Sequence, residues 1–310
     1  MLAAFARAAC LDDVRLERQQ EIESFFLEFA CDAAPAFSNR RKGDLCAPVK
    51  RALLEHRLQA AMYYARLHDA DGLARQLEHE DTNWVTICDG AVALWQANHS
   101  TSVGRLGDAP AYIVGTPSAV EADDISRRLS EHAFQAAGAA GLQSLFESVG
   151  ILVLVRERAM FGVSNSWTTT ALRSTIYSDY VADPVAFGTE LVHEAAHLWL
   201  NEALVATGNI RQSRARFNSP WKGEPRKAFG FVHATFAFSI VVVYLQWALC
   251  APAISRKCRK YLSALAIRET QRLLAVGDDL PGALKLVDSR LAHLIEEVHE
   301  RAIASSEPVA

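Results

Sequence analysis

The sequence has few features of a disulfide-stabilised, nucleic-acid-binding or nucleotide-binding protein. Its 310 residues contain six cysteines and no CxxC pair, so we expect reduced thiols in a cytoplasmic protein and no cysteine-bound zinc. The formal net charge is −4, and the basic residues are scattered among acidic ones, which predicts no nucleic-acid partner. Neither GxGxxG nor GxxxxGK[ST] occurs, so nucleotide binding has no support.

The sequence also has no internal repeat, low-complexity tract or Pro/Gly/Ser-rich linker. We therefore expect a single domain over residues 1–310, with a helical N-terminal part (about 1–110) and a second part (about 111–310) that contains the motif described below. Half of the residues are hydrophobic, which is ample for a large core.

One apolar run, residues 229–252, is long enough to cross a bilayer. His233, Thr235, Ser239 and Gln246 interrupt it, and a fully buried helix of a large domain has the same composition. We favour the buried helix over a membrane-associated one and expect no membrane partner.

Most segments have helical periodicity, so the sequence predicts a mainly α-helical fold. An amphipathic stripe covers residues 14–29, a second begins at Pro48, and a last one covers residues 284–298. Thr116 to Glu121 has the pattern of a capping box before a helix that ends near Gly138 and Gly141. Short strand-like runs at 111–114, 151–155 and 174–180 predict a small β-sheet near the motif.

The strongest chemical signal is the pentapeptide HEAAH at residues 193–197. Asp183-Pro184 predicts the N-cap and first residue of its helix, and Gly208-Asn209 its end. His193 and His197 are four residues apart, so they share one helical face and can meet one metal ion. Glu194 projects about 100° around the axis, near that ion but not necessarily bonded to it.

A five-residue pattern with three defined positions also occurs by chance on solvated surfaces. Here the flanking residues, LV before and AAHLWL within and after the motif, are apolar nearly all round, so the helix is expected to be buried. Buried histidine and glutamate side chains need partners, and a metal ion supplies them.

Two histidines are too few for a protein metal site, so a third ligand must come from elsewhere. The metzincin extension is absent, because Leu200 and Ala203 occupy its glycine and histidine positions. The candidates are Glu202, Glu224 and His233. Glu202 is about 140° from His197 and Glu224 lies in a polar loop, so we favour His233, inside the apolar run.

The segment between the two parts of the site adds Ser219-Pro220-Trp221, a rigid turn, and Arg226. If residues 226–233 are helical, Arg226 lies about two turns before His233 and can reach a ligand beside the metal. Arginine binds a carboxylate bidentately, although a surface pair between Arg226 and Glu224 explains the residue equally well.

HEAAH followed by SPWKGEPRKAFGFVHATFAF resembles the HExxH-motif family encoded beside peptide natural-product genes. Ser219, Pro220, Trp221, Arg226, Gly230, His233 and Phe236 match its second motif; Lys227 and Ala234 depart from it. The likeness covers about residues 185–240. It implies an Fe(II)/2-oxoglutarate-dependent hydroxylase that uses O₂ and acts at the β-carbon of a side chain in a peptide, such as a precursor peptide.

On this resemblance, His193, His197 and His233 would bind Fe(II), and Arg226 would hold a carboxylate of 2-oxoglutarate. Glu194 would orient a ligand or bound water from outside the coordination sphere rather than act as a base. Trp221, Tyr177 and Asp179 are further candidates for the co-substrate pocket. Imidazole ligands suit several metals, so ligand type does not identify iron.

The alternative is a zinc-dependent metallopeptidase, in which the same three histidines and a water complete a tetrahedral site and Glu194 is the general base. Arg226 and the SPW segment favour the oxygenase, because a peptidase needs neither. A non-catalytic protein with a structural metal, or a peptide-binding module, is the remaining possibility.

Overall fold

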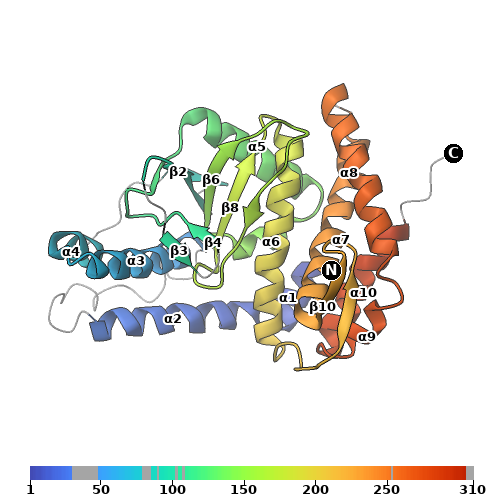
Figure 1. The fold of residues 1–310 in the computed structure, drawn as a ribbon, viewed down its shortest axis with the longest axis horizontal. Coiled ribbons are helices and arrows are strands. Elements are labelled where there is room, and N and C mark those ends of the chain that lie inside the picture. Colours follow the sequence, from blue (N-terminus) through green and yellow to red (C-terminus); the bar gives the residue numbers. More distant parts are fainter. Residues whose placement is uncertain are drawn as a thin grey trace.

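The computed structural model describes residues 1–29, 48–78, 85–88, 91–101, 104–106, 109–252 and 254–304. Helix accounts for 58% of the structure and strand for 15%. The predicted class, mainly α-helical with a sheet beside the HEAAH helix, is therefore confirmed (Figure 1).

Four helices form most of the N-terminal part: α1 (Leu2–Ala8), α2 (Leu11–Phe29), α3 (Pro48–Arg66) and α4 (Ala70–Glu78). Pro48 begins α3, as its sequence position predicted. Contrary to expectation, the part before residue 110 is not purely helical. It contains β1 (Thr86–Ile87), β2 (Val92–Ala97) and β3 (Gly104–Leu106), and β4 (Ala109–Ala111) begins within it.

The main sheet has the order β1-β2-β6-β8-β7, with β5 (Ala119–Glu121) also paired to β2. Its centre is parallel: β6 (Ile151–Glu157) lies between β2 and β8 (Thr175–Tyr180). The short strands β1, β5 and β7 (Ser166–Trp167) pair antiparallel at its edges. Strands buried on both faces have near-continuous apolar sequences, which explains the ILVLV run of β6.

The two faces of the sheet contribute to different cores. Leu152, Leu154 and Ile176 point into the large core with α5 (Asp124–Ala139) and the HEAAH helix. Ile151, Val153 and Tyr177 point the other way, into a smaller core shared with α3. Because side chains alternate along a strand, neighbouring residues of β8 lie on opposite sides of the sheet.

The HEAAH helix, α6 (Pro184–Ala206), lies between the sheet and a second layer of helices (Figure 1). The Asp183 carboxylate accepts hydrogen bonds from the backbone N–H groups of Val185 and Ala186, which confirms the predicted cap. The helix ends before Gly208 and Asn209, both with positive φ, as predicted.

The second helical layer contains α7 (Ala228–Cys250), α8 (Arg256–Leu274), α9 (Leu280–Leu284) and α10 (Ser289–Ala304). Tyr244 of α7 donates a hydrogen bond to the carbonyl of Val185, and its ring lies against Gly188 of α6. A Cβ at position 188 would overlap the Tyr244 hydroxyl, so glycine is what allows the two helices to come this close.

Helix α7 is the one described helix that is long and apolar enough to cross a membrane by length and composition, with a mean hydropathy of 2.0. However, 83% of that window is buried inside the protein, against α6, α8 and α10. The arrangement is that of a core helix in a soluble protein, as the sequence analysis favoured.

Three local expectations were wrong. The strand expected at 111–114 does not form, because β4 ends at Ala111. Thr116 to Glu121 is not a capping box: Ser118 bonds the backbone N–H of Ile113, strand β5 follows, and Asp123 caps α5 instead. The C-terminal stripe is broken between α9 and α10. Cys10, Cys250 and Cys258 are free thiols, whereas Cys31 and Cys46 lie outside the described residues.

Candidate metal centre

His193 and His197 lie one turn apart on α6, with their side chains facing each other. Their Nε2 atoms are 3.2 Å apart, and the two rings are perpendicular with centroids 4.7 Å apart. Metal–nitrogen bonds of about 2.1 Å at an angle of about 100° place two ligand nitrogens roughly 3.2 Å apart. The pair therefore fits two adjacent positions around one cation.

His233, on α7, meets the opposite edge of the His197 ring. The Nδ1 atoms of His197 and His233 are 3.2 Å apart, and the two ring planes are inclined by 19° with centroids 5.4 Å apart. The Nε2 atom of His233 is buried and has no hydrogen-bond partner within the described part of the chain. The three imidazoles thus form a row with His197 in the middle.

A row differs from three rings that converge on one point. Within the described ranges, no group of three or more histidine, cysteine, aspartate or glutamate side chains is arranged to hold a metal ion. The structure brings all three predicted histidines together and places two of them as a chelating pair. That they share one cation remains a prediction.

Burial keeps these imidazoles neutral, which is the form that binds metals. It lowers the pKa of His193 to about 4 and that of His233 to about 3. The pKa of His197 also falls well below its usual value, first because of burial and then because of the nearby His193 and Arg226. Protons therefore compete weakly for these nitrogens at neutral pH.

Glu194 is the acidic member of the site and is buried, with 3% of its surface exposed. Its Oε1 atom accepts a 2.8 Å hydrogen bond from the Ser166 hydroxyl and lies 3.9 Å from His193 Nε2. Burial raises the pKa of Glu194 to about 8; the Ser166 hydrogen bond opposes this shift and the charge of Glu190 adds to it.

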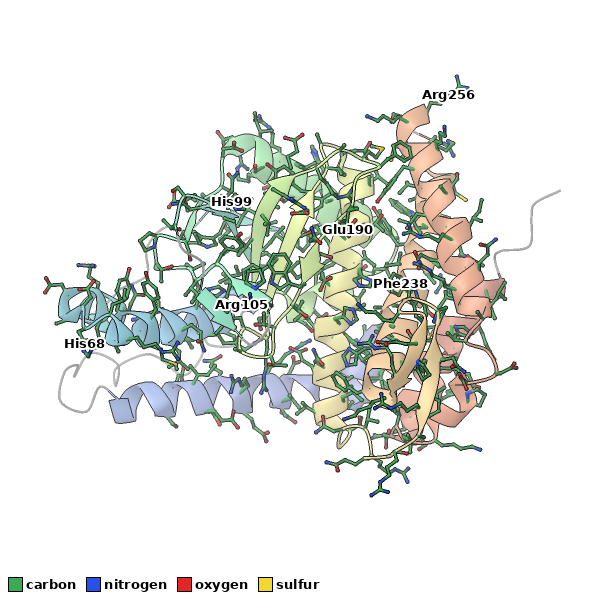
Figure 2. The ribbon with its side chains drawn as sticks, viewed as in Figure 1. His68, His99, Arg105, Glu190, Phe238 and Arg256 are labelled. Carbon is green, nitrogen blue, oxygen red and sulfur yellow. The ribbon has the colours of Figure 1, made fainter. Side chains whose placement is uncertain are left out.

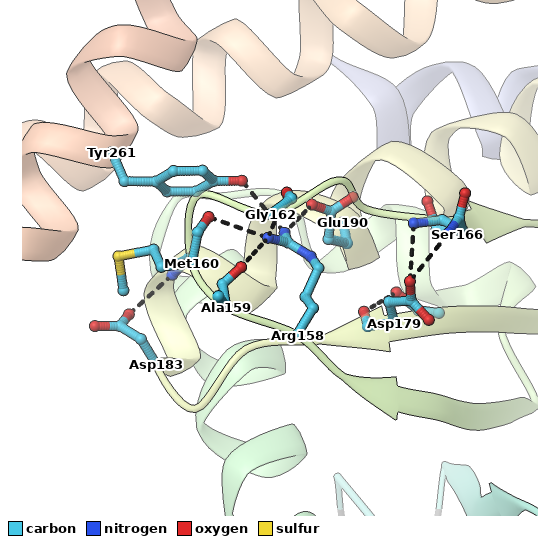
Figure 3. Close-up of polar contacts among 12 residues, drawn as sticks. Arg158, Ala159, Met160, Gly162, Ser166, Asp179, Asp183, Glu190 and Tyr261 are labelled. Carbon is cyan, nitrogen blue, oxygen red and sulfur yellow. Dashed lines mark hydrogen bonds and ion pairs between the residues drawn. The ribbon is translucent and has the colours of Figure 1, made fainter.

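The loop that carries Ser166, residues 158–166, is fixed at both ends by buried ionic side chains (Figure 3). Arg158 donates to the carbonyls of Ala159, Met160 and Gly162 and forms a 2.7 Å ion pair with Glu190, one turn before the site on α6. At the other end, Asp179 accepts hydrogen bonds from the backbone and side-chain N–H groups of Asn165. Ser166 is thereby held in place above Glu194.

Arg226 lies close to the histidine row but not on a helix, contrary to the helical spacing assumed from the sequence. It belongs to β10 (Glu224–Lys227), which pairs with β9 (Arg216–Ser219). Its guanidinium folds back over Gly230 and donates a 3.3 Å hydrogen bond to that residue's carbonyl. Its positive charge lowers the pKa of both His197 and His233, so it acts on the site electrostatically.

An aromatic wall covers the other side of His193. Phe238 of α7, labelled in Figure 2, has its ring centroid 4.6 Å from that of His193. Trp221, in the turn between β9 and β10, stacks on Phe238 with centroids 4.8 Å apart and donates its indole N–H to Glu269. Trp221, proposed as a pocket residue, is therefore separated from His193 by Phe238.

The rejected ligand candidates lie away from the histidines, as the sequence analysis expected. Glu202 pairs with Arg15 and accepts a hydrogen bond from Ser148, so it stabilises the contact between α2 and α6. Glu224 is exposed on the β9–β10 hairpin.

Tyr177 and Asp179, proposed as pocket residues, are not brought to the histidines. Tyr177 is fully buried on the far face of the sheet, where it stacks on Trp167 and donates to the carbonyl of Tyr112. Asp179 is 1% exposed, and its carboxylate is engaged by Arg156 and Asn165. The face alternation of β8 accounts for both positions.

The sequence analysis missed Ser166 and Phe238. Ser166 begins the two-residue strand β7, which is too short to show a period, so no local pattern connects it to Glu194. Phe238 is one of many apolar residues in the segment 229–252, and only its contact with His193 distinguishes it.

Comparison with known proteins adds no identification. No family model matches the chain, and no curated protein matches it.

Proposed function

We propose that this protein is an Fe(II)/2-oxoglutarate-dependent hydroxylase of the cytoplasm that modifies a side chain, at its β-carbon, in a peptide substrate. The observation that carries the proposal is the His193–His197 pair, whose Nε2 atoms are spaced for one cation beside a buried acid. When bound, the iron would supply oxygen activation coupled to oxidative decarboxylation of 2-oxoglutarate.

The third position of the metal site is assigned to His233. Its Nε2 atom is buried and has no hydrogen-bond partner among the described residues. A bound metal ion would provide that partner. The Nδ1 atom of His233 lies 3.2 Å from Nδ1 of His197, which keeps the ring beside the chelating pair.

The role given to Arg226 is to hold a carboxylate of 2-oxoglutarate. The positive charge of Arg226 lowers the pKa of both His197 and His233, and this electrostatic influence on the site supports the role. The guanidinium is half-buried and donates one N–H to the carbonyl of Gly230. Its other N–H groups can donate to a planar carboxylate. The Trp221–Phe238 wall would close the opposite side of the pocket.

The contacts of Glu194 fit the role proposed for it in the oxygenase. Its Oε1 atom already accepts a hydrogen bond from the Ser166 hydroxyl. An acid held in this way suits the orientation of a ligand or water beside the metal.

The test is anaerobic reconstitution with Fe(II), followed by addition of 2-oxoglutarate and O₂ and measurement of succinate. We expect succinate formation in the wild type and its loss in His197→Asn and His233→Ala. Zinc-dependent peptide cleavage that is abolished by Glu194→Gln and indifferent to 2-oxoglutarate would establish the peptidase instead.

A further inference from the structure

A cavity of about 210 Å³ lies between α2, α3, the C-terminal half of α6 and the segment 170–174 that precedes β8. Three parts of the chain lead to it from the candidate metal centre. The first is α6, from which Leu198 and Asn201 line the cavity, one and four residues after His197. Residues four apart share one face of a helix, so Asn201 continues the face that carries His193 and His197.

The other two connections start at Ser166 and at His233. Ser166 donates a hydrogen bond to Glu194, and the chain that follows it reaches the cavity at Thr170. On α7, Phe229 lines the cavity, and its ring centroid is 4.2 Å from that of His233. The cavity therefore adjoins the metal centre, and one extended molecule can occupy both.

The charged side chains around the cavity are engaged with neighbouring groups. Two lining arginines face acids at N–O distances of 2.8 to 3.6 Å: Arg15 with Asp12 and Glu202, and Arg18 with Glu21 and Glu55. The other two donate to backbone carbonyls, Arg51 to that of Glu147 and Arg173 to that of Thr170. A charged guest would have to displace one of these partners, so the cavity favours a neutral guest.

Apolar side chains form the mouth of the cavity and one of its walls. Phe229 is 53% exposed and Val205 is 46% exposed, and both lie at the cavity. Leu198 and Leu204 are buried behind them. Large apolar side chains that stay exposed beside a cavity are typical of a ligand site, because a guest removes their surface from water.

The size of the cavity fits one aromatic ring. An apolar cavity of about 150 Å³ takes up benzene. The larger volume here leaves room for the methylene group that joins a ring to a peptide backbone. A ring also suits the walls, because it can pair with the ring of Phe229, and because arginine side chains stack on aromatic faces.

We propose that this cavity binds an aromatic side chain of the peptide substrate, with the ring between Phe229 and Leu198. Asn201 lies on the same wall, and its amide can bond the peptide backbone beside that side chain. The proposed hydroxylase then acts on peptides that carry an aromatic residue near the one it modifies. The identity of the guest as a peptide rests on the proposed function, whereas the binding of a ring rests on the cavity alone.

The spacing along α6 sets the distance within the peptide. Leu198 and Val205 mark the ends of the α6 wall, one and eight residues beyond His197. At a rise of about 1.5 Å per residue, the middle of that wall lies roughly 7 Å past His197. An extended peptide covers about 3.3 Å per residue, so we expect the aromatic residue about two positions from the modified one.

The test measures binding to the full-length, metal-free protein at pH 7 by ligand-observed NMR, which detects weak affinities. The probes are the N-acetyl amides of phenylalanine, alanine and glutamate. We expect saturable binding of the phenylalanine probe with little dependence on salt, and no binding of the other two. Equal binding of the phenylalanine and alanine probes, or a preference for glutamate, would overturn the proposal.

Two valines with similar exposure provide a matched pair of variants. Val205→Trp places an indole in the mouth of the cavity and should weaken binding of the phenylalanine probe more than about tenfold. Val120→Trp, at a valine of β5 that is 43% exposed, adds the same side chain away from the cavity and should change nothing. Wild-type affinity in Val205→Trp, or an equal loss in Val120→Trp, would show that the ring binds elsewhere.

A free ring separates a peptide from a small aromatic compound. Asn201→Ala should weaken binding of the phenylalanine probe several-fold and leave binding of p-cresol unchanged, because p-cresol has no backbone. Binding of p-cresol without binding of the phenylalanine probe would assign the cavity to a small aromatic compound and contradict the proposal. An unchanged affinity of Asn201→Ala for both probes would remove Asn201 from the site.

The outcomes also distinguish this proposal from the proposed function. If the phenylalanine probe binds and Val205→Trp blocks it, but no succinate forms in the iron assay, the oxygenase fails and the aromatic site stands. If succinate forms but the probe does not bind, the substrate class is wrong and the oxygenase stands.

Discussion

His56 and His233 are both buried, neutral histidines, but their ring nitrogens are used differently. His56, on α3, accepts a hydrogen bond from the backbone N–H of Val114 at Nδ1 and donates to the Thr175 hydroxyl from Nε2. His233 contacts His197 at Nδ1, and its Nε2 atom has no hydrogen-bond partner among the described residues. Burial lowers the pKa of both to about 3. Burial and a shifted pKa therefore do not distinguish the two histidines, whereas the use of their ring nitrogens does.

The largest expected effect comes from removing the central ring of the row. His197→Asn takes away one of the two paired Nε2 atoms, so Fe(II) affinity should fall more than about 100-fold, since even the outer partners of metal ligands contribute roughly 10- to 100-fold. Metal content after dialysis measures this. His132→Asn, at an exposed position of α5, is the control, and full metal retention in His197→Asn would show that the row is not the metal site.

The structural histidine should behave in the opposite way. His56→Ala leaves the Val114 N–H and the Thr175 hydroxyl without their partner and opens a cavity, so the free energy of unfolding should fall by about 3 kcal/mol. Denaturant titration measures the loss. Metal bound per folded molecule should equal that of the wild type; if it falls with stability, the two kinds of histidine are not distinct.

The low pKa of His56 predicts how stability depends on pH. The unfolded chain takes up a proton below about pH 6.5, whereas the folded protein does so only near pH 3. Stability is therefore lost as pH falls from 6.5 towards 3, by ~2 kcal/mol per such histidine at pH 5. The free energy of unfolding should be measured at pH 7 and pH 5 in the wild type and in His56→Gln. The loss of stability between the two pH values should be ~2 kcal/mol smaller in the variant. An unchanged pH dependence would mean that His56 is not held neutral.

The smallest effect concerns the acid of the site. Ser166→Ala removes the hydroxyl that orients Glu194, so the rate constant for succinate formation should fall roughly five- to tenfold with little change in thermal stability. Ser166→Thr retains a hydroxyl and should restore most of the rate. If the threonine variant is as slow as the alanine variant, the hydrogen bond does not position Glu194.

Much of the local structure could be predicted from short patterns. Asp183-Pro184 and Gly208-Asn209 bound α6 because capping depends on residues next to the helix ends. The same reasoning failed at Thr116 to Glu121, where the Ser118 hydroxyl bonds Ile113 and a strand intervenes. Local hydrogen-bonding residues serve turns as readily as caps, and sequence does not distinguish the two.

Helical spacing predicted one part of the candidate site, the pair of histidines on α6, and no more. Four-residue spacing alone brings His193 and His197 together, whatever the rest of the fold does. The reach of Arg226 was considered on the condition of a helical spacing to His233, but the residue lies on a strand and folds back over Gly230. Tyr177 and Asp179 were assigned to the pocket, but each is committed to contacts elsewhere.

The amino-acid sequence by itself determined a long buried helix with two histidines and a glutamate on adjoining faces, because these follow from periodicity and capping. Tertiary packing decided the rest. The packing of α7 against α6, with its close approach at Gly188, placed His233 on the Nδ1 side of His197 and Phe238 over His193. The packing of the sheet against α6 brought Ser166 of β7 to Glu194. These contacts join residues 28 to 45 positions apart, which no local pattern encodes.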